Sequence, residues 1–300
     1  MIPEKKTRRR LLLMAISAVV ALTMAAPTFA NEQSMQAGTQ TEQAGSQSAQ
    51  LTVQSAQAGS QTAQPDAMCL GQQVTPAGYD GEVLDENTAE MVDIDGQYYM
   101  VDQYGDPIIG WVVTDEGSWY TNEEGIVQTG LKEVDEAYYY FYPYDDEYYG
   151  IMCDVGIYKN YVISYTGVCY KMPKKKKDKK CNKMAKLIAK CSGKYASEMT
   201  DLEKVERAAI TVSAFYDRCK YTMKGKYYNK PYGVFYAKRC SCAGTTRALG
   251  LVLSKMGYKW KHQNKNKYKH QWCVLTMDGQ KGWADGQIGM ADYGKHPAAR

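Results

Sequence analysis

The chain has 300 residues, with 26 tyrosines, nine cysteines and a formal net charge of +4 at pH 7. That modest charge conceals an asymmetry. Residues 81–150 contain 18 acidic residues and one basic residue, a balance of −17, whereas residues 151–300 contain 31 basic and 10 acidic residues, a balance of +21. The pattern excludes one evenly charged domain and predicts an acidic module and a basic module. Either the two modules attract each other, or the basic module binds an anionic polymer.

The N-terminus has the three parts of a secretory signal peptide. Five basic residues lie in the first ten positions, an apolar run starts at Leu11, and the small residues Thr28 and Ala30 precede a cleavage before Asn31. The alternative is a membrane anchor, for which the apolar run is short; twin-arginine export is also open. We expect residues 1–30 to be removed and the protein to be secreted, with no transmembrane span remaining.

Residues 31–66 consist almost entirely of Gln, Ser, Ala, Gly and Thr. Such a segment cannot bury enough apolar surface to offset the loss of chain entropy. We assign residues 31–80 to a disordered linker that holds the following modules away from a surface.

A period of 20 residues organises the acidic module, which we assign to residues 81–170. Gly110, Gly130 and Gly150 recur at this spacing, and aromatic pairs fall in step with them. These pairs are Tyr98–Tyr99, Trp119–Tyr120 and Tyr139–Tyr140. Turn glycines with paired aromatics predict stacked β-hairpins, each too small to bury its own face.

The segments DGQYYMVDQYGDPIIGW and EGSWYTNEEGIVQTG resemble the choline- and glucan-binding type of cell-wall-binding repeat in Gram-positive surface proteins. The resemblance implies a β-hairpin repeat solenoid that binds wall polysaccharide or teichoic acid. It also implies aromatic grooves that hold a ligand such as a quaternary ammonium ion, with Trp111, Trp119 and Tyr120 as the matching residues. The alternative is that these aromatics only pack the repeats.

Residues 171–193 include the lysine-rich stretch PKKKKDKK. We interpret them as a solvated linker, because export argues against nucleic acid as a partner. The final module, 194–300, begins with a capping box in which Thr200 precedes Glu203 by three residues. Apolar residues at helical spacing follow, at positions 205, 208, 209, 212 and 215, and predict a helix.

The stretch CSCAGTTRALGLVLSKMGY predicts a second helix, with Ser241 as the N-cap and Gly257 as the stop. Cys242 then lies in the first turn, where backbone N–H groups and the helix dipole favour a thiolate. Cys240 lies outside the helix. The competing interpretations are a disulfide cysteine or a metal-binding Cys-x-Cys, although a second metal-ligand pair is missing.

A base for this thiolate is predicted within residues 269–287. The Asp278–Gly279 pair predicts a two-residue hairpin turn. In that register Trp272 opposes Asp285, which places His270 diagonal to Asp285 on the same face and within reach of it. A histidine oriented by a carboxylate completes a cysteine-based triad. The alternative is a histidine that packs in a half-buried strand.

The order of helix cysteine, strand histidine and strand aspartate resembles the transglutaminase-like superfamily, which shares the papain-like core. The matching segments are CAGTTRALGLVLSKMGY, HQW and WAD. The resemblance implies an α+β fold in which the helix that carries Cys242 packs on an antiparallel sheet. It also implies that Cys242 is the nucleophile, His270 the base and acid, and Asp285 the orienting group, with no metal or cofactor.

The function expected from these features is that of a secreted, wall-associated thiol enzyme. It would transfer acyl groups from a protein or peptide to water or to an amine through a thioester. The alternative is a non-catalytic wall-binding adhesin with a vestigial triad. The remaining eight cysteines could pair outside the cell.

Overall fold

The computed structural model describes residues 67–68, 74–85, 88–264, 266 and 269–299. The predicted signal peptide and residues 31–66 of the predicted linker lie outside these ranges. Within them, no helix combines the length and the hydropathy needed to cross a bilayer. Strand β1 (Ala67–Met68) pairs antiparallel with β8 (Val155–Tyr158), and the carbonyl of Val74 accepts a hydrogen bond from Ser118 at 2.6 Å. The linker assigned to 31–80 is therefore wrong for these described residues near its end.

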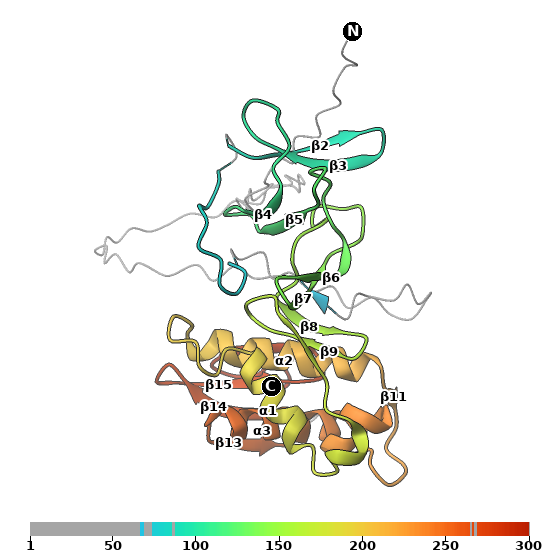
Figure 1. Ribbon diagram of the computed structural model, residues 1–300. Helices are drawn as coiled ribbons and strands as arrows, with labels where there is room; N and C mark the ends of the chain where they lie inside the picture. Colours follow the sequence, from blue (N-terminus) through green and yellow to red (C-terminus); the bar gives the residue numbers. More distant parts are fainter. Residues whose placement is uncertain (1–66, 69–73, 86–87, 265, 267–268, 300) are drawn as a thin grey trace, which may run out of the picture. The chain divides into compact units, whose positions relative to one another are not determined.

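Three antiparallel hairpins follow, each of which is a two-stranded sheet (Figure 1). They consist of β2 (Glu90–Ile94) with β3 (Gln97–Val101), β4 (Gly110–Val113) with β5 (Ser118–Thr121), and β6 (Gly130–Val134) with β7 (Ala137–Phe141). The first strands begin at residues 90, 110 and 130, which confirms hairpins at the predicted 20-residue period. Backbone bonds link the first and second hairpins to the chain that follows the next hairpin: Val127 N–H donates to Tyr98 O, and Met152 N–H donates to Ser118 O.

The aromatic pairs pack on both faces of their strands, because successive side chains of a strand point in opposite directions. In β5, Trp119 belongs to one apolar cluster, whereas Tyr120 packs against the cluster around Phe141. In β7, Tyr139 belongs to that same cluster and Tyr140 to a third one. A lone hairpin has too little core to be stable, and the pairs let its neighbours cover it from both sides.

The basic module begins before the predicted boundary at residue 171. Strands β8, β9 (Tyr161–Ile163) and β10 (Cys169–Lys171) form one antiparallel sheet with β1, and Ile157 and Val162 lie in the same core as helix α1 (Asn182–Cys191). The predicted linker over 171–193 is therefore wrong for α1, which buries Met184 and Ile188. The apolar residues of α1 share one helix face, and the surrounding lysines hide this pattern in the composition.

The remaining elements form an α+β core. They are 3₁₀ turn η1 (Lys175–Lys177), α2 (Asp201–Asp217), β11 (Lys220–Tyr221), π-helical segment η2 (Gly233–Ala237), β12 (Arg239–Cys240), α3 (Cys242–Met256), β13 (Trp260–Gln263), β14 (Trp272–Met277), β15 (Gln280–Asp285), β16 (Met290–Tyr293) and 3₁₀ turn η3 (Pro297–Ala299). Strands β13 to β16 form one antiparallel sheet in chain order. Helix α3 packs against β13, β14 and β15, as expected for the helix that carries Cys242.

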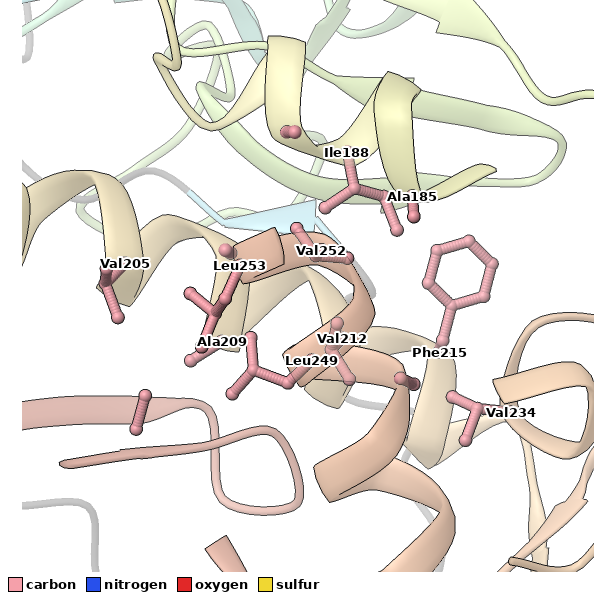
Figure 2. Packing of buried hydrophobic residues seen from close by; sticks show 14 of the residues in the cluster. Ala185, Ile188, Val205, Ala209, Val212, Phe215, Val234, Leu249, Val252 and Leu253 are labelled. Atoms are coloured by element: carbon pink, nitrogen blue, oxygen red, sulfur yellow. The ribbon is translucent and has the colours of Figure 1, made fainter. Parts of the chain in front are cut away.

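Apolar side chains from three helices meet in one core (Figure 2). Helix α1 contributes Ile188, α2 contributes Val212 and Phe215, and α3 contributes Leu249 and Val252. All five are at most 4% exposed. Because α3 is packed on several sides, its first turn has a fixed position, which is the requirement for a reactive group placed there.

The N-terminus of α2 is held by two sets of hydrogen bonds. The predicted capping box is present: Thr200 Oγ1 accepts the N–H of Glu203, and the Glu203 carboxylate accepts the N–H of Thr200. In addition, the carboxylate of Asp278 accepts the N–H groups of Asp201 at 2.9 Å and Leu202 at 3.0 Å. The turn of the β14–β15 hairpin therefore satisfies the unpaired N–H groups of a distant helix.

A buried ion pair joins α2 to the chain just before β8. Arg207 and Asp154 lie 2.7 Å apart, with side chains 6% and 2% exposed, and Arg207 also donates to the carbonyl of Asp154 at 2.9 Å. Removing one partner of a buried pair leaves an uncompensated charge in the core. The pair therefore fixes where α2 lies against the sheet that contains β8.

Candidate active site

Cys242 is the first residue of α3, and Ser241 is its N-cap with an extended backbone, as predicted. The Ser241 side chain makes no capping hydrogen bond. Its hydroxyl lies 3.4 Å from the carbonyl of Tyr228 instead. The backbone N–H of Ala243 donates to the sulfur of Cys242. The positive end of the helix dipole thus acts on the thiol, where it stabilises the thiolate.

The β14–β15 hairpin has the predicted register. Asp278 and Gly279 have φ angles of 49° and 76°, as the two central residues of a type I′ turn require. Met277 pairs with Gln280 across the turn. Continuing the ladder one step beyond Cys273 and Ala284 places Trp272 opposite Asp285, with His270 two residues before Trp272 in the chain.

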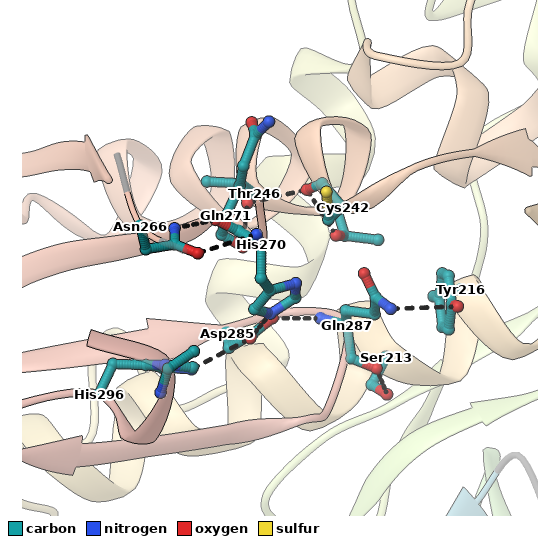
Figure 3. A network of polar contacts seen from close by, with 12 residues as sticks. Ser213, Tyr216, Cys242, Thr246, Asn266, His270, Gln271, Asp285, Gln287 and His296 are labelled. Atoms are coloured by element: carbon teal, nitrogen blue, oxygen red, sulfur yellow. Dashed lines mark hydrogen bonds and ion pairs between the residues drawn. The ribbon is translucent and has the colours of Figure 1, made fainter. Parts of the chain in front are cut away.

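His270 and Asp285 meet there (Figure 3). Nε2 of His270 hydrogen-bonds Oδ2 of Asp285, and Nδ1 is left as the ring nitrogen available to Cys242, whose nearness contributes to the raised pKa of His270. Asp285 is 1% exposed and accepts the backbone N–H of Gln287 on Oδ1 at 2.8 Å. His270 therefore lies between the thiol and a carboxylate that is itself held in place.

The three groups shift one another's pKa values. Burial acts to raise the pKa of the Cys242 thiol, but His270, Tyr221 and the N–H of Ala243 together outweigh burial, and the pKa lies below its ordinary value. Hydrogen bonds with Asp285 and then Cys242 raise the pKa of His270 to about 9. Burial opposes ionisation of Asp285, yet its contacts with His270 and His296 hold its pKa below the usual range. Together the shifts favour thiolate, imidazolium and carboxylate.

Two neighbours of the triad carried no signal in the sequence. Asn266 accepts the N–H of His270 at 3.2 Å and donates to its carbonyl at 2.6 Å, which fixes the backbone of His270. Tyr221 of β11, 48% exposed, hydrogen-bonds the sulfur of Cys242 through its hydroxyl. Both come from segments whose distance from Cys242 in space cannot be read from spacing along the chain.

Cys240 differs from Cys242 in its surroundings. It is fully buried in β12, and a hydrogen bond from Cys219 lowers its pKa while that of Cys219 is raised. Its partner is thus a second thiol and not an imidazole. The eight cysteines among the described residues, Cys240 and Cys242 included, are free thiols.

His270, Asp285 and His296 have donor atoms within 4.8 Å of one another, a spacing that could suit a metal ion. The hydrogen bonds of His296 do not fit that use. The N–H of Ala298 donates to Nδ1 of His296 at 3.0 Å, so the ring proton lies on Nε2, the atom that faces the carboxylate. A protonated nitrogen cannot ligate a metal, and the group is built for hydrogen bonding.

The three aromatic residues proposed to bind a wall ligand are not equivalent. Trp119 is 3% exposed and donates its ring N–H to the carbonyl of Tyr149 at 3.0 Å, so its assignment to an open groove is wrong. Trp111 and Tyr120 are only partly buried and meet edge to face, with ring centroids 5.3 Å apart. Tyr139 also meets Trp111 edge to face, with ring centroids 4.9 Å apart.

No protein-family model and no curated protein matches the chain. Among solved structures, the chain is similar to one described as "Crystal structure of a TGase", with 13% identity and a TM-score of 0.31. That match covers 43% of this chain and 37% of the other. A TM-score this low does not establish a common fold, and the functional argument therefore depends on the geometry of the site.

Proposed function

We propose that the chain is a thiol enzyme of the transglutaminase-like kind, which transfers acyl groups through a thioester on Cys242. The observation that carries the proposal is the position of His270, which hydrogen-bonds Asp285 through Nε2 and lowers the pKa of the nearby Cys242 thiol. A nucleophile, a base within reach and a group that orients the base are the parts that covalent acyl transfer requires.

The reaction follows from these positions. The Cys242 thiolate attacks the carbonyl carbon of a carboxamide, and the oxyanion that forms is stabilised by the backbone N–H at the start of α3 and by the Tyr221 hydroxyl. His270 gives its proton to the departing amine as the C–N bond breaks, which leaves a thioester. His270 then takes a proton from water or from an incoming amine, which attacks the thioester and frees the thiol.

Water as the acceptor gives an amidase or peptidase, and a lysine amine gives a protein cross-linker. The triad has the same task in both reactions. Incubating the protein with a glutamine peptide, with and without a primary amine, separates the two outcomes by mass: a gain of the amine indicates transfer, and loss of ammonia with gain of water indicates hydrolysis.

The proposal includes export and attachment to a Gram-positive cell wall. The signal-peptide pattern and the paired-aromatic hairpins support it, and the partly exposed pair of Trp111 and Tyr120 is the part of the hairpins that suits a sugar ring or a quaternary amine. We expect the chain starting at Asn31 to sediment with purified walls in moderate salt, and Trp111→Ala to release it. Tyr104→Ala, which removes an aromatic ring that is 81% exposed, is the matched control. Release by salt alone would assign binding to the lysines instead.

The direct test is alkylation of the native chain with iodoacetamide, followed by peptide mass mapping. We expect Cys242 to react faster than Cys240, and His270→Ala to slow Cys242 alone. Cys242→Ala should abolish thioester formation with an acyl donor, while Cys240→Ala retains it. Equal reactivity of the two cysteines, or no thioester in the unmodified protein, would support the non-catalytic adhesin in place of the enzyme.

A further inference from the structure

His296 lies against the triad without being part of it (Figure 3). It follows β16 in the chain and is 5% exposed. Its ring stacks on Trp272 with centroids 4.1 Å apart and 13° between planes, and meets Trp283 edge to face at 4.3 Å. The two tryptophans belong to β14 and β15, so His296 packs on the hairpin that brings His270 and Asp285 together.

The tautomer of His296 is fixed by the backbone. Nδ1 accepts the N–H of Ala298 at 3.0 Å, which leaves the proton of the neutral ring on Nε2. Nε2 lies 3.3 Å from Oδ2 of Asp285, the same oxygen that His270 bonds. This contact is not a full hydrogen bond, and Nε2 has no hydrogen-bond partner elsewhere in the described part of the chain. A buried N–H group without a hydrogen-bond partner destabilises the fold. The carboxylate of Asp285 is the group near enough to offset this cost for Nε2 of His296.

We propose that His296 is a positioning residue that holds the Asp285 carboxylate towards His270. Asp285 then has three donors around it: His270 and His296 at Oδ2, and the N–H of Gln287 at Oδ1. With the carboxylate fixed in this way, His270 remains oriented towards Cys242 when it gives up its proton. The inference deepens the proposed function and rests on it.

A purely structural role for the ring is the alternative, because His296 fills the space between two tryptophans. His296→Phe separates the two roles, since it keeps the stacked ring and removes the N–H. His296→Gln does the reverse, because its amide can return an N–H near the position of Nε2. Ala298→Pro is a third variant, which leaves the ring in place and removes the N–H that fixes its tautomer.

The readouts are the NMR titration of His270 in the full chain and the pH dependence of Cys242 alkylation. We expect His296→Phe to lower the pKa of His270 by about one unit, and to slow alkylation roughly tenfold at neutral pH, below the ~100-fold that a 1 Å misplacement can cost. His296→Gln is expected to recover most of both effects, and Ala298→Pro to show a smaller shift in the same direction. Thermal melting identifies variants that no longer fold. If His296→Phe does not fold, the titration of His270 in Ala298→Pro tests the inference in its place.

An unchanged His270 titration in folded His296→Phe would reduce His296 to a packing residue and overturn the inference. A rise in the pKa of His270 would also overturn it, because the N–H would then be weakening the Asp285–His270 contact. Failure of the proposed function looks different: the unmodified protein would form no thioester, whereas the His270 titration would still respond to His296.

Discussion

Replacing Asp285 with asparagine tests the electrostatics of the site most directly. The variant keeps the shape of the side chain and removes the charge of the carboxylate, whose hydrogen bond is the first cause of the raised pKa of His270. The shift of that pKa from an ordinary 6.5 to about 9 corresponds to about 3 kcal/mol. Without the charge of Asp285, burial lowers the pKa of His270 and only Cys242 still raises it. We therefore expect the pKa of His270 to fall towards its ordinary value.

The asparagine amide can also donate to Nε2 of His270, which forces the ring proton onto Nδ1 and removes the base from Cys242. We therefore expect acyl transfer to fall by about 1,000- to 10,000-fold. We expect the alkaline limb of the pH–rate profile to follow the pKa of His270, about 9 in the unmodified protein, and to move towards neutral pH in the variant. A group whose pKa is raised by folding stabilises the fold at pH values below its pKa in the unfolded chain, and this stabilisation is lost as the pH rises through its pKa in the folded protein. The stability that the variant loses should therefore be largest below about pH 6.5 and vanish above about pH 9.

Stopped-flow acylation and urea unfolding across pH 5–10 measure both effects. The matched control is Asp292→Asn, at an exposed position on the adjacent strand β16, for which neither the rate nor the limb should change. An alkaline limb that stays near pH 9 in Asp285→Asn would refute the reasoning, because the raised pKa of His270 would then have another source.

Three further substitutions test the fold. Asp154→Ala leaves the guanidinium of Arg207 buried without its partner, so we expect urea unfolding to show a loss of about 3–5 kcal/mol; a loss below about 1 kcal/mol would contradict the burial of this pair. Asp278→Ala removes the acceptor of two N–H groups at the start of α2, and should cost about 1–2 kcal/mol in the same assay, with unchanged stability as the opposing result. Trp119→Ala should cost about 3–5 kcal/mol as a core truncation, whereas a stable variant that loses only wall binding would restore Trp119 to a ligand groove.

The 20-residue period of the N-terminal hairpins and the register of the β14–β15 hairpin could both be predicted, because their sequence signals are local. Asp278 and Gly279 adopt positive φ angles as their residue types favour, and a two-residue turn leaves one register. Gly257 ends α3 with a φ of 109°, again as glycine favours. From these points, the positions of Cys242 on α3, of Asp285 at the end of β15 and of His270 two residues before β14 follow by counting along the chain.

The module boundaries were harder to predict, because the composition of a segment does not distinguish the buried face of a helix or strand from its exposed face. The lysines around α1 indicated a solvated linker, yet one face of the helix is buried in the core. In the same way, the pairing of Trp119 with Tyr120 suggested two equivalent aromatics, and the strand places them on opposite faces with different exposure. Which face of a helix or strand is buried depends on the elements that pack against it, and the local sequence pattern does not identify these elements.

The sequence by itself therefore determined the elements that local rules control: the capped helices, the type I′ turn, and the positions on α3 and beside the β14–β15 hairpin from which Cys242, His270 and Asp285 emerge. Only the tertiary structure decided what surrounds them. Asn266, Tyr221 and His296 reach the triad through hydrogen bonds and ring contacts between separate elements, and Asp278 caps a helix 76 residues away from it. These contacts depend on how the elements pack, because hydrogen bonds and stacking act over a few ångströms in space and are independent of distance along the chain.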